Sequence, residues 1–170
     1  MLAVFDLDGT IIDSAEVILE SHDAAWASVG VERPAKEDIL SLTGLPLIEI
    51  MQRLGPEYDP VALARVYSET YVKANRHERL FEGITDLLAR PFRAAVATGK
   101  SQRGADRVIK EFGFSGRFEI VLGGNSVSKP KPNPDLLFAI MEKTGTKDIV
   151  MIGDTTYDLE MAHAAGVKGI

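Results

Sequence analysis

Four short apolar runs in this sequence each lead into polar residues that could do chemistry. These residues are Asp6 and Asp8 after the first run, Thr98 and Gly99 after the second, Lys129 and Lys131 beyond the third, and Asp154 and Asp158 after the fourth. Carboxylates and a lysine gathered at one site suit phosphate and Mg²⁺, because Mg²⁺ prefers carboxylate oxygens, water and substrate phosphates as ligands. The absence of cysteine excludes disulfides, thiolate catalysis and cysteine-type zinc sites.

The aspartates can take different roles in phosphate chemistry. Asp6 and Asp154 would raise each other's pKa unless a cation shared the site. With a metal ion and a lysine screening the phosphoryl group, a carboxylate can attack it and form an aspartyl-phosphate. Asp8 can give a proton to the departing alkoxide and later take one from water. The Thr98 hydroxyl and the Gly99 amide can donate to the phosphoryl oxygens.

The elements that must position these residues follow a strand–helix rhythm. The expected strands are Leu2–Phe5, Ala94–Ala97, Glu119–Leu122, Ile149–Ile152 and Val167–Ile170. The expected helices are Gln102–Phe112, one capped by Asn133 with Pro134 first and Gly145 beyond its end, and Asp158–Ala165 closed by Gly166. Continuous apolar strands between helices predict an α/β fold with a doubly wound, Rossmann-like parallel sheet. Ligands bind at the carboxyl ends of such strands, where all of these polar residues fall.

Residues 14–79 break that rhythm. They contain no convincing strand and instead predict helices at Ser14–Val29, Ile48–Leu54 and Pro60–Asn75. Asp13 and Glu16 have the spacing of a capping box for the first of these helices, with Gly30 as its stop. We therefore expect residues 1–13 and 80–170 to form the α/β core and residues 14–79 to form an all-helical cap domain inserted after the first strand.

Length, charge and composition exclude several classes of protein. With 170 residues, the chain can form one core with a modest insertion. A net charge of −6 argues against a nucleic-acid partner, and no apolar run approaches the roughly 20 residues that span a bilayer. A P-loop around Gly99-Lys100-Ser101 needs a glycine at position 94, where alanine stands. We expect a cytoplasmic protein whose partner is a small phosphorylated metabolite.

The four motifs together resemble those of the haloacid dehalogenase superfamily. The resembling segments are Asp6-Leu7-Asp8-Gly9-Thr10, Thr98, Lys131-Pro132, and Gly153-Asp154 through Asp158, in the family's order. The resemblance implies that Asp6 is the nucleophile and a metal ligand, and that Asp8 is the general acid/base and lends its backbone carbonyl to the metal. It further implies that Thr98 and the lysine hold phosphate, and that Asp154 completes a Mg²⁺ site with Asp158 in support. The helical insertion resembles the cap of phosphoglycolate phosphatases.

Two lysines compete for the lysine of the third motif. Lys129-Pro130 and Lys131-Pro132 both offer the Lys-Pro dipeptide. We favour Lys131, because its segment resembles the family's Lys-Pro-x-Pro-Asp pattern and leads directly into a helix. Lys129 stays the alternative.

The sequence thus favours a Mg²⁺-dependent phosphatase, similar to phosphoglycolate phosphatases, that acts on a small organic phosphate monoester. A β-phosphoglucomutase-like phosphomutase is the nearest alternative, but Ile18 and Leu47 replace the cap histidine and arginine usual in that group. A dehalogenase would lack Asp8. A non-catalytic phosphate-binding module on the same fold is the remaining alternative.

Other polar residues have structural interpretations of equal weight. Asp158 could serve only as a helix cap, and Lys100 could be a solvated lysine. The histidines His22, His77 and His163 lack metal-ligand spacing, and Trp26 is expected in the core. Arg53, Lys73 and Arg76 could meet an anionic substrate or form a solvated face of the cap.

Overall fold

A five-stranded parallel sheet forms the centre of the computed structural model, which describes residues 1–74 and 77–170. Its strands are β1 (Leu2–Phe5), β4 (Arg93–Ala97), β5 (Val121–Leu122), β6 (Ile149–Ile152) and β7 (Lys168–Gly169). Their spatial order is β5-β4-β1-β6-β7, so β1 lies in the middle. The doubly wound Rossmann-like sheet predicted from the sequence is confirmed.

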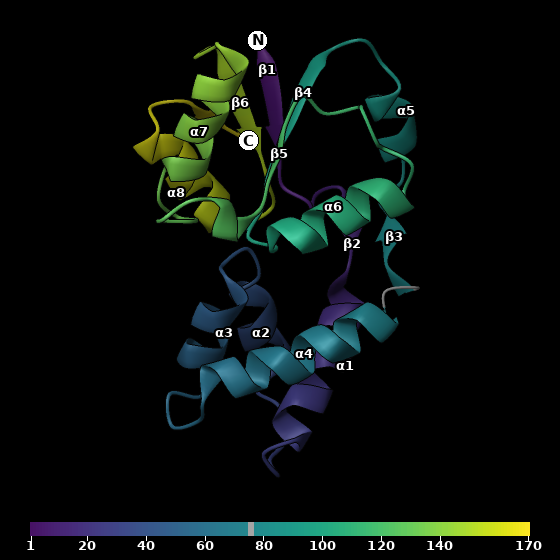
Figure 1. Ribbon diagram of the computed structural model, residues 1–170, viewed down its shortest axis with the longest axis vertical. Coiled ribbons are helices and arrows are strands. Elements are labelled where there is room, and N and C mark those ends of the chain that lie inside the picture. Colours follow the sequence, from purple (N-terminus) through teal and green to yellow (C-terminus); the bar gives the residue numbers. More distant parts are fainter. Residues whose placement is uncertain (75–76) are drawn as a thin grey trace.

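Helices cover both faces of the sheet (Figure 1). On one face lie α5 (Ile84–Leu88) and α6 (Gln102–Glu111), and on the other lie α7 (Asp135–Thr144) and α8 (Thr156–Ala164). A hydrophobic core lies on each face of the sheet, and alternate residues of β1 contribute to one core or the other. Phe5 packs with α5 and α6, while Val4 packs with α7 and α8. Because every central strand is buried on both faces, its sequence is continuously apolar rather than alternating.

Two helices that flank the sheet start at other residues than the sequence predicts. The N-cap of α7 is Pro134, not Asn133, whose side-chain amide instead donates to the Pro130 carbonyl at 3.1 Å. The α8 helix starts at Thr156, two residues before the predicted Asp158. Thr155 and Asp158 form a capping box there, which satisfies backbone donors of the first turn and so fixes the earlier start.

A separate group of helices lies beyond the carboxyl edge of the sheet (Figure 1). It consists of α1 (Ala15–Ala27), α2 (Lys36–Ser41), α3 (Leu47–Leu54) and α4 (Pro60–Ala74). These helices bury apolar clusters of their own, and Trp26, with 2% of its surface exposed, is a core residue as predicted. The short α2 was not predicted. The predicted cap residues Asn75 and Arg76 lie outside the described residues.

A two-stranded antiparallel ribbon connects the helical group to the sheet. It pairs β2 (Ile12–Asp13) with β3 (Arg79–Leu80), and neither strand is long enough to show a sequence pattern. The predicted capping box of Asp13 and Glu16 is wrong. Because Asp13 belongs to β2, the N-cap position falls to Ser14, which makes no side-chain capping bond. That residues 14–79 act as a domain of their own stays a prediction.

Across residues 1–74 and 77–170, we find no helix with the length and apolar character needed to cross a bilayer. The expected cytoplasmic location stays a prediction.

Candidate active site

Three aspartates meet at the carboxyl edge of the sheet. Asp6 directly follows β1, which pairs with β6 so that Phe5 lies opposite Ile152. The register brings Asp6 beside the loop after β6, which carries Asp154 and leads into α8, whose first turn carries Asp158. Each of the three aspartates has a carboxylate oxygen within 4.8 Å of the others. The structure therefore brings together the acids that the sequence analysis assigned to one site.

Lys131 lies among these carboxylates. Its Nζ is 3.0 Å from Asp6 Oδ2 and 2.5 Å from Asp158 Oδ1, and its side chain is fully buried. Burial alone would lower the pKa of the Lys131 ammonium, but the charges of Asp6 and Asp158 outweigh burial and raise that pKa. Lys129 is exposed. The structure thus places Lys131, and not Lys129, at the carboxylate cluster.

Asp158 has both of its oxygens occupied by neighbours. Oδ1 accepts from Lys131, while Oδ2 accepts from the backbone N–H of Thr155 at 3.1 Å and from its hydroxyl at 2.7 Å. It therefore caps α8 and positions the Lys131 ammonium at the same time. The capping interpretation and the supporting role are both compatible with these contacts.

Asp154 approaches the loop after β1 so closely that residue 9 must be glycine. The Thr10 hydroxyl donates to Asp154 Oδ1 at 3.1 Å. Gly9 has a φ of +78°, and a Cβ built on it would lie 2.1 Å from Asp154 Oδ2. Any side chain at position 9 would therefore displace the Asp154 carboxylate, besides straining the backbone.

The carboxylate cluster fits a hard metal ion. Asp6 Oδ1 accepts from the Leu7 N–H at 2.7 Å, and the ion pair with Lys131 is the one polar contact of the buried Asp6 Oδ2 among the described residues. Burial raises the pKa of Asp6 to about 6, against the opposing effect of the Lys131 charge. A buried carboxylate oxygen with unused bonding capacity, next to the half-exposed Asp154, is a ligand set that Mg²⁺ prefers. Metal contact by the Asp8 carbonyl stays a prediction.

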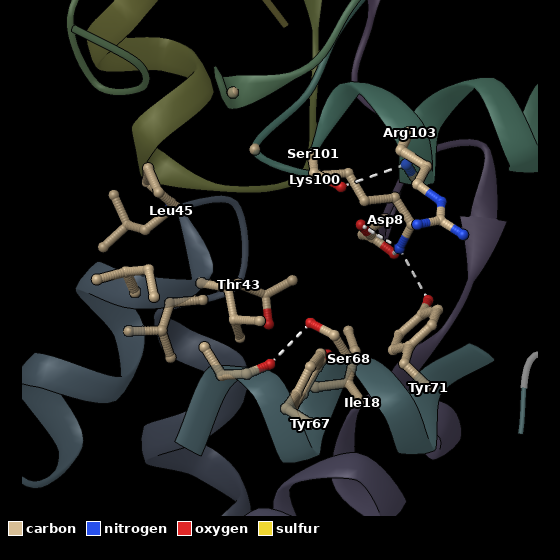
Figure 2. Close-up of a pocket in the computed structure, with 18 of the residues that line it drawn as sticks. Asp8, Ile18, Thr43, Leu45, Tyr67, Ser68, Tyr71, Lys100, Ser101 and Arg103 are labelled. Atoms are coloured by element: carbon tan, nitrogen blue, oxygen red, sulfur yellow. Dashed lines mark hydrogen bonds and ion pairs between the residues drawn. The ribbon is translucent and has the colours of Figure 1, made fainter. Parts of the chain in front are cut away.

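Asp8 lies apart from this cluster and faces a cavity (Figure 2). Lys100 Nζ is 2.8 Å from Asp8 Oδ1 and 3.0 Å from Oδ2, and the Ser14 hydroxyl donates to Oδ1 at 2.5 Å. The Lys100 side chain is only 12% exposed, so it is not the solvated lysine that the sequence equally allowed. The structure therefore adds Lys100 to the site.

A hydrogen-bonded chain continues from Lys100 into the helical group. Lys100 Nζ donates to the Tyr71 hydroxyl at 2.8 Å, and this hydroxyl donates to Glu78 Oε1 at 2.5 Å (Figure 2 shows the first contact). Arg107 of α6 binds both Glu78 oxygens, at 2.8 and 3.1 Å. Sequence analysis missed Tyr71, Glu78 and Arg107, because no local pattern distinguishes them from ordinary helix and surface residues.

Thr98 and Gly99 follow β4 at the same edge of the sheet. Thr98 is buried, and its hydroxyl accepts from the Lys100 N–H at 3.3 Å. A Cβ on Gly99 would lie 2.1 Å from the Gly44 carbonyl oxygen, so glycine allows the α2–α3 loop to touch this edge. Phosphate binding by Thr98 and Gly99 stays a prediction.

The histidines contribute little to this site. His22 is buried in α1, where its Nδ1 accepts from Trp26 Nε1 at 3.3 Å. His77 lies 3.4 Å from Glu20, and His163 is exposed in the last turn of α8.

Comparisons with known proteins agree with this arrangement. The family model described as haloacid dehalogenase-like hydrolase matches residues 3–170. Phosphoglycolate phosphatase of Photobacterium profundum is 31% identical over 95% of this chain and 78% of its own. Pyrophosphatase PpaX of Halalkalibacterium halodurans is 28% identical over 97% of this chain and 80% of its own.

Solved structures show the same fold. The crystal structure of CbbY from Rhodobacter sphaeroides in complex with phosphate superimposes with a TM-score of 0.84, at 23% identity, over 99% of this chain and 84% of that one. The family match covers nearly the whole chain, and the fold and the clustered motif residues agree with it. This chain therefore belongs to the haloacid dehalogenase-like hydrolase family and is an enzyme.

Proposed function

We propose that this protein is a Mg²⁺-dependent phosphatase that hydrolyses a small organic phosphate monoester through an aspartyl-phosphate on Asp6. One observation carries the proposal. Lys131 Nζ lies 3.0 Å from Asp6 Oδ2, and the Asp6 carboxylate shares a cluster with Asp154. The phosphatases among its relatives support the same reaction class.

Asp6 and Asp154 would hold the metal ion through their carboxylates. When bound, Mg²⁺ withdraws charge from the phosphoryl oxygens and so lets an anionic nucleophile approach the phosphorus. Asp158 is not needed as a ligand, since Lys131 and Thr155 already occupy its oxygens.

The chain's own residues then carry the two chemical steps. An Asp6 carboxylate oxygen forms a bond to phosphorus while the ester P–O bond breaks, and Asp8 gives its proton to the departing alkoxide. In the second step Asp8 takes a proton from water, the water oxygen attacks phosphorus, and the bond to Asp6 breaks to release phosphate. Lys131 and the Thr98 hydroxyl would hold the non-bridging oxygens.

We further propose that residues 14–79 act as a cap that closes over this site. Two contacts support this role: Tyr71 of α4 accepts from Lys100, and the Gly44 carbonyl closely approaches Gly99. Closure would exclude water while Asp6 is attacked, and opening would admit the water of the second step.

A hydrolase is favoured over a phosphomutase by the cap residues that face the cavity. Ile18 and Leu47 both line it. Neither side chain can bind the second phosphate of a bisphosphate intermediate, because both are apolar.

The test is phosphate release from p-nitrophenyl phosphate with and without Mg²⁺, for the wild type, Asp6→Asn and the control Asp86→Asn, an exposed acid of α5. We expect Mg²⁺-dependent turnover that only Asp6→Asn abolishes, and a hydroxamate on Asp6 when hydroxylamine traps the acyl phosphate. Unchanged activity of Asp6→Asn would contradict the mechanism. No phosphate release from any ester would favour a phosphate-binding module.

A further inference from the structure

The cavity above Asp8 has two chemically different ends (Figure 2). Its volume is about 1140 Å³, at the upper limit of ordinary small-molecule sites. The wall from the helical group also contains polar residues, among them Thr43, Ser68 and Glu69, but most of its side chains are apolar or aromatic. The apolar and aromatic part includes Ile18, Leu45, Ile48, Ile50, Tyr67 and Val72. Charged groups gather at the opposite end, around Asp8 and Lys100. A bound phosphate ester would therefore place its phosphoryl group at the charged end and its organic group against the apolar wall.

The two least exposed cations that line the cavity already have acidic partners. Lys100 is paired with Asp8 at 2.8 Å, and Arg107 is paired with Glu78 at the same distance. These two cations are therefore largely neutralised by their partners, whereas Arg103 and Lys73, which also line the cavity, are exposed to solvent. A carboxylate on the substrate would lose its hydration against the apolar side chains of the cavity, which is unfavourable.

The apolar wall includes an aromatic surface and side chains with accessible area. The rings of Tyr67 and Tyr71, both lining the cavity, lie 5.7 Å apart between centroids. Ile48 and Val72 are 44% and 59% exposed, so a ligand can still cover them. Covering such surface stabilises a bound apolar group in proportion to the area removed from water.

We propose, resting on the phosphatase activity proposed above, that the substrate is a monoester of an apolar alcohol with an aromatic or branched aliphatic group. This substrate class differs from the substrates in the names of the relatives. Phosphoglycolate carries a carboxylate two carbons from the phosphate oxygen, and pyrophosphate carries a second phosphate in place of the organic group.

The test compares esters whose alcohols have similar acidity, so that the leaving group does not decide the rate. The value of kcat/KM is measured in Mg²⁺ for ethyl, 3-methylbutyl and 2-phenylethyl phosphate, together with 2-phosphoglycolate and pyrophosphate. We expect the 2-phenylethyl ester to exceed ethyl phosphate and 2-phosphoglycolate by about 10- to 100-fold. A preference for 2-phosphoglycolate over the 2-phenylethyl ester would overturn the inference and leave the phosphatase proposal intact.

Binding of non-hydrolysable analogues separates the two proposals. The dissociation constant of 2-phenylethylphosphonate, measured by calorimetry, is expected to be about 10-fold or more below those of ethylphosphonate and phosphonoacetate. If 2-phenylethylphosphonate binds most tightly but no ester is hydrolysed, the phosphatase activity is refuted and the apolar site is supported. Equal binding of the three phosphonates would refute the apolar site.

Two valines of α4 provide a matched pair of variants. Val72 lines the cavity and is 59% exposed, whereas Val61 is 62% exposed but does not line it. Both sites are open to solvent, so neither serine substitution is expected to unfold the chain. Val72→Ser should reduce the ratio of kcat/KM between 2-phenylethyl and ethyl phosphate about 3-fold, and Val61→Ser should leave the ratio unchanged. If the two variants gave the same ratio, the claim that the organic group of the substrate contacts Val72 in the apolar wall would be wrong.

Discussion

The Asp6→Asn protein is expected to be inactive yet more stable than the wild type when no metal ion is present. Burial raises the pKa of the Asp6 carboxyl from its ordinary 3.8 to about 6. A carboxyl whose pKa is higher in the folded chain than in the unfolded chain destabilises the fold once it is ionised. The asparagine keeps the oxygen that accepts from the Leu7 N–H and removes the charge.

The size of the effect follows from the two pKa values. A rise from 3.8 to about 6 corresponds to about 3 kcal/mol of unfavourable free energy for ionised Asp6. This penalty is absent below pH 3.8, grows between pH 3.8 and about 6, and is constant at higher pH. At pH 7.5 we therefore expect Asp6→Asn to gain up to about 3 kcal/mol, or about 6–12 °C in Tm for a chain of this length.

Urea unfolding at pH 7.5 in EDTA and in Mg²⁺ measures this gain. In Mg²⁺ the difference should shrink, because ligand binding stabilises the folded wild type and Asp6→Asn lacks a metal ligand. Asp8→Asn is the control: it should also be inactive, but it breaks the contact with Lys100 and should gain no stability. If Asp6→Asn in EDTA unfolds at or below the urea concentration that unfolds the wild type, the argument from burial is wrong.

Three further substitutions test single contacts. Gly9→Ala should lose at least about 1 kcal/mol more than Gly30→Ala, which has a similar φ but open space, and only Gly9→Ala should weaken Mg²⁺ binding in titrations. Lys131→Met leaves buried carboxylates unpaired and should cost about 3–5 kcal/mol in urea unfolding, whereas the exposed Lys129→Met should change stability by less than about 0.5 kcal/mol. Burial lowers the pKa of His22 from 6.5 to about 4, so the folded chain resists protonation and loses stability as the pH falls below about 6.5. Between pH 7.5 and 5 the free energy of unfolding should fall by about 2 kcal/mol more in the wild type than in His22→Gln. Equal losses in the two proteins would contradict this.

The central strands were predictable because each carries its own signal, whereas β5 and β7 are shorter than the predicted Glu119–Leu122 and Val167–Ile170. Leu2–Phe5 and Ile149–Ile152 are short apolar runs followed by acids, and their observed bounds match the prediction. Burial on both faces imposes this pattern locally, whatever the rest of the chain does. The ribbon of β2 and β3 was not predictable, because two-residue strands have no periodicity and these two pair only in the fold, across the 65 residues of chain between them (14–78).

Helix ends were less predictable than strands, for a local reason. Asp13 and Glu16 have the correct spacing for a capping box, but Asp13 is held in β2. Thr155 and Asp158 form the box that does occur, and there the acid has a second partner in Lys131. Spacing shows which caps are possible, and tertiary contacts select among them.

By itself, the sequence determined the fold class and the residues at the carboxyl edge of the sheet, because the strands and their ends are encoded in local apolar runs. The spatial order β5-β4-β1-β6-β7 is a property of the structure. Only the tertiary structure decided which side chains touch. It selected Lys131 over Lys129, paired Lys100 with Asp8, and linked Lys100 to Tyr71 of the helical group. These pairings join residues distant in sequence, and their geometry and burial depend on how the helices pack beyond the sheet, which no local pattern encodes.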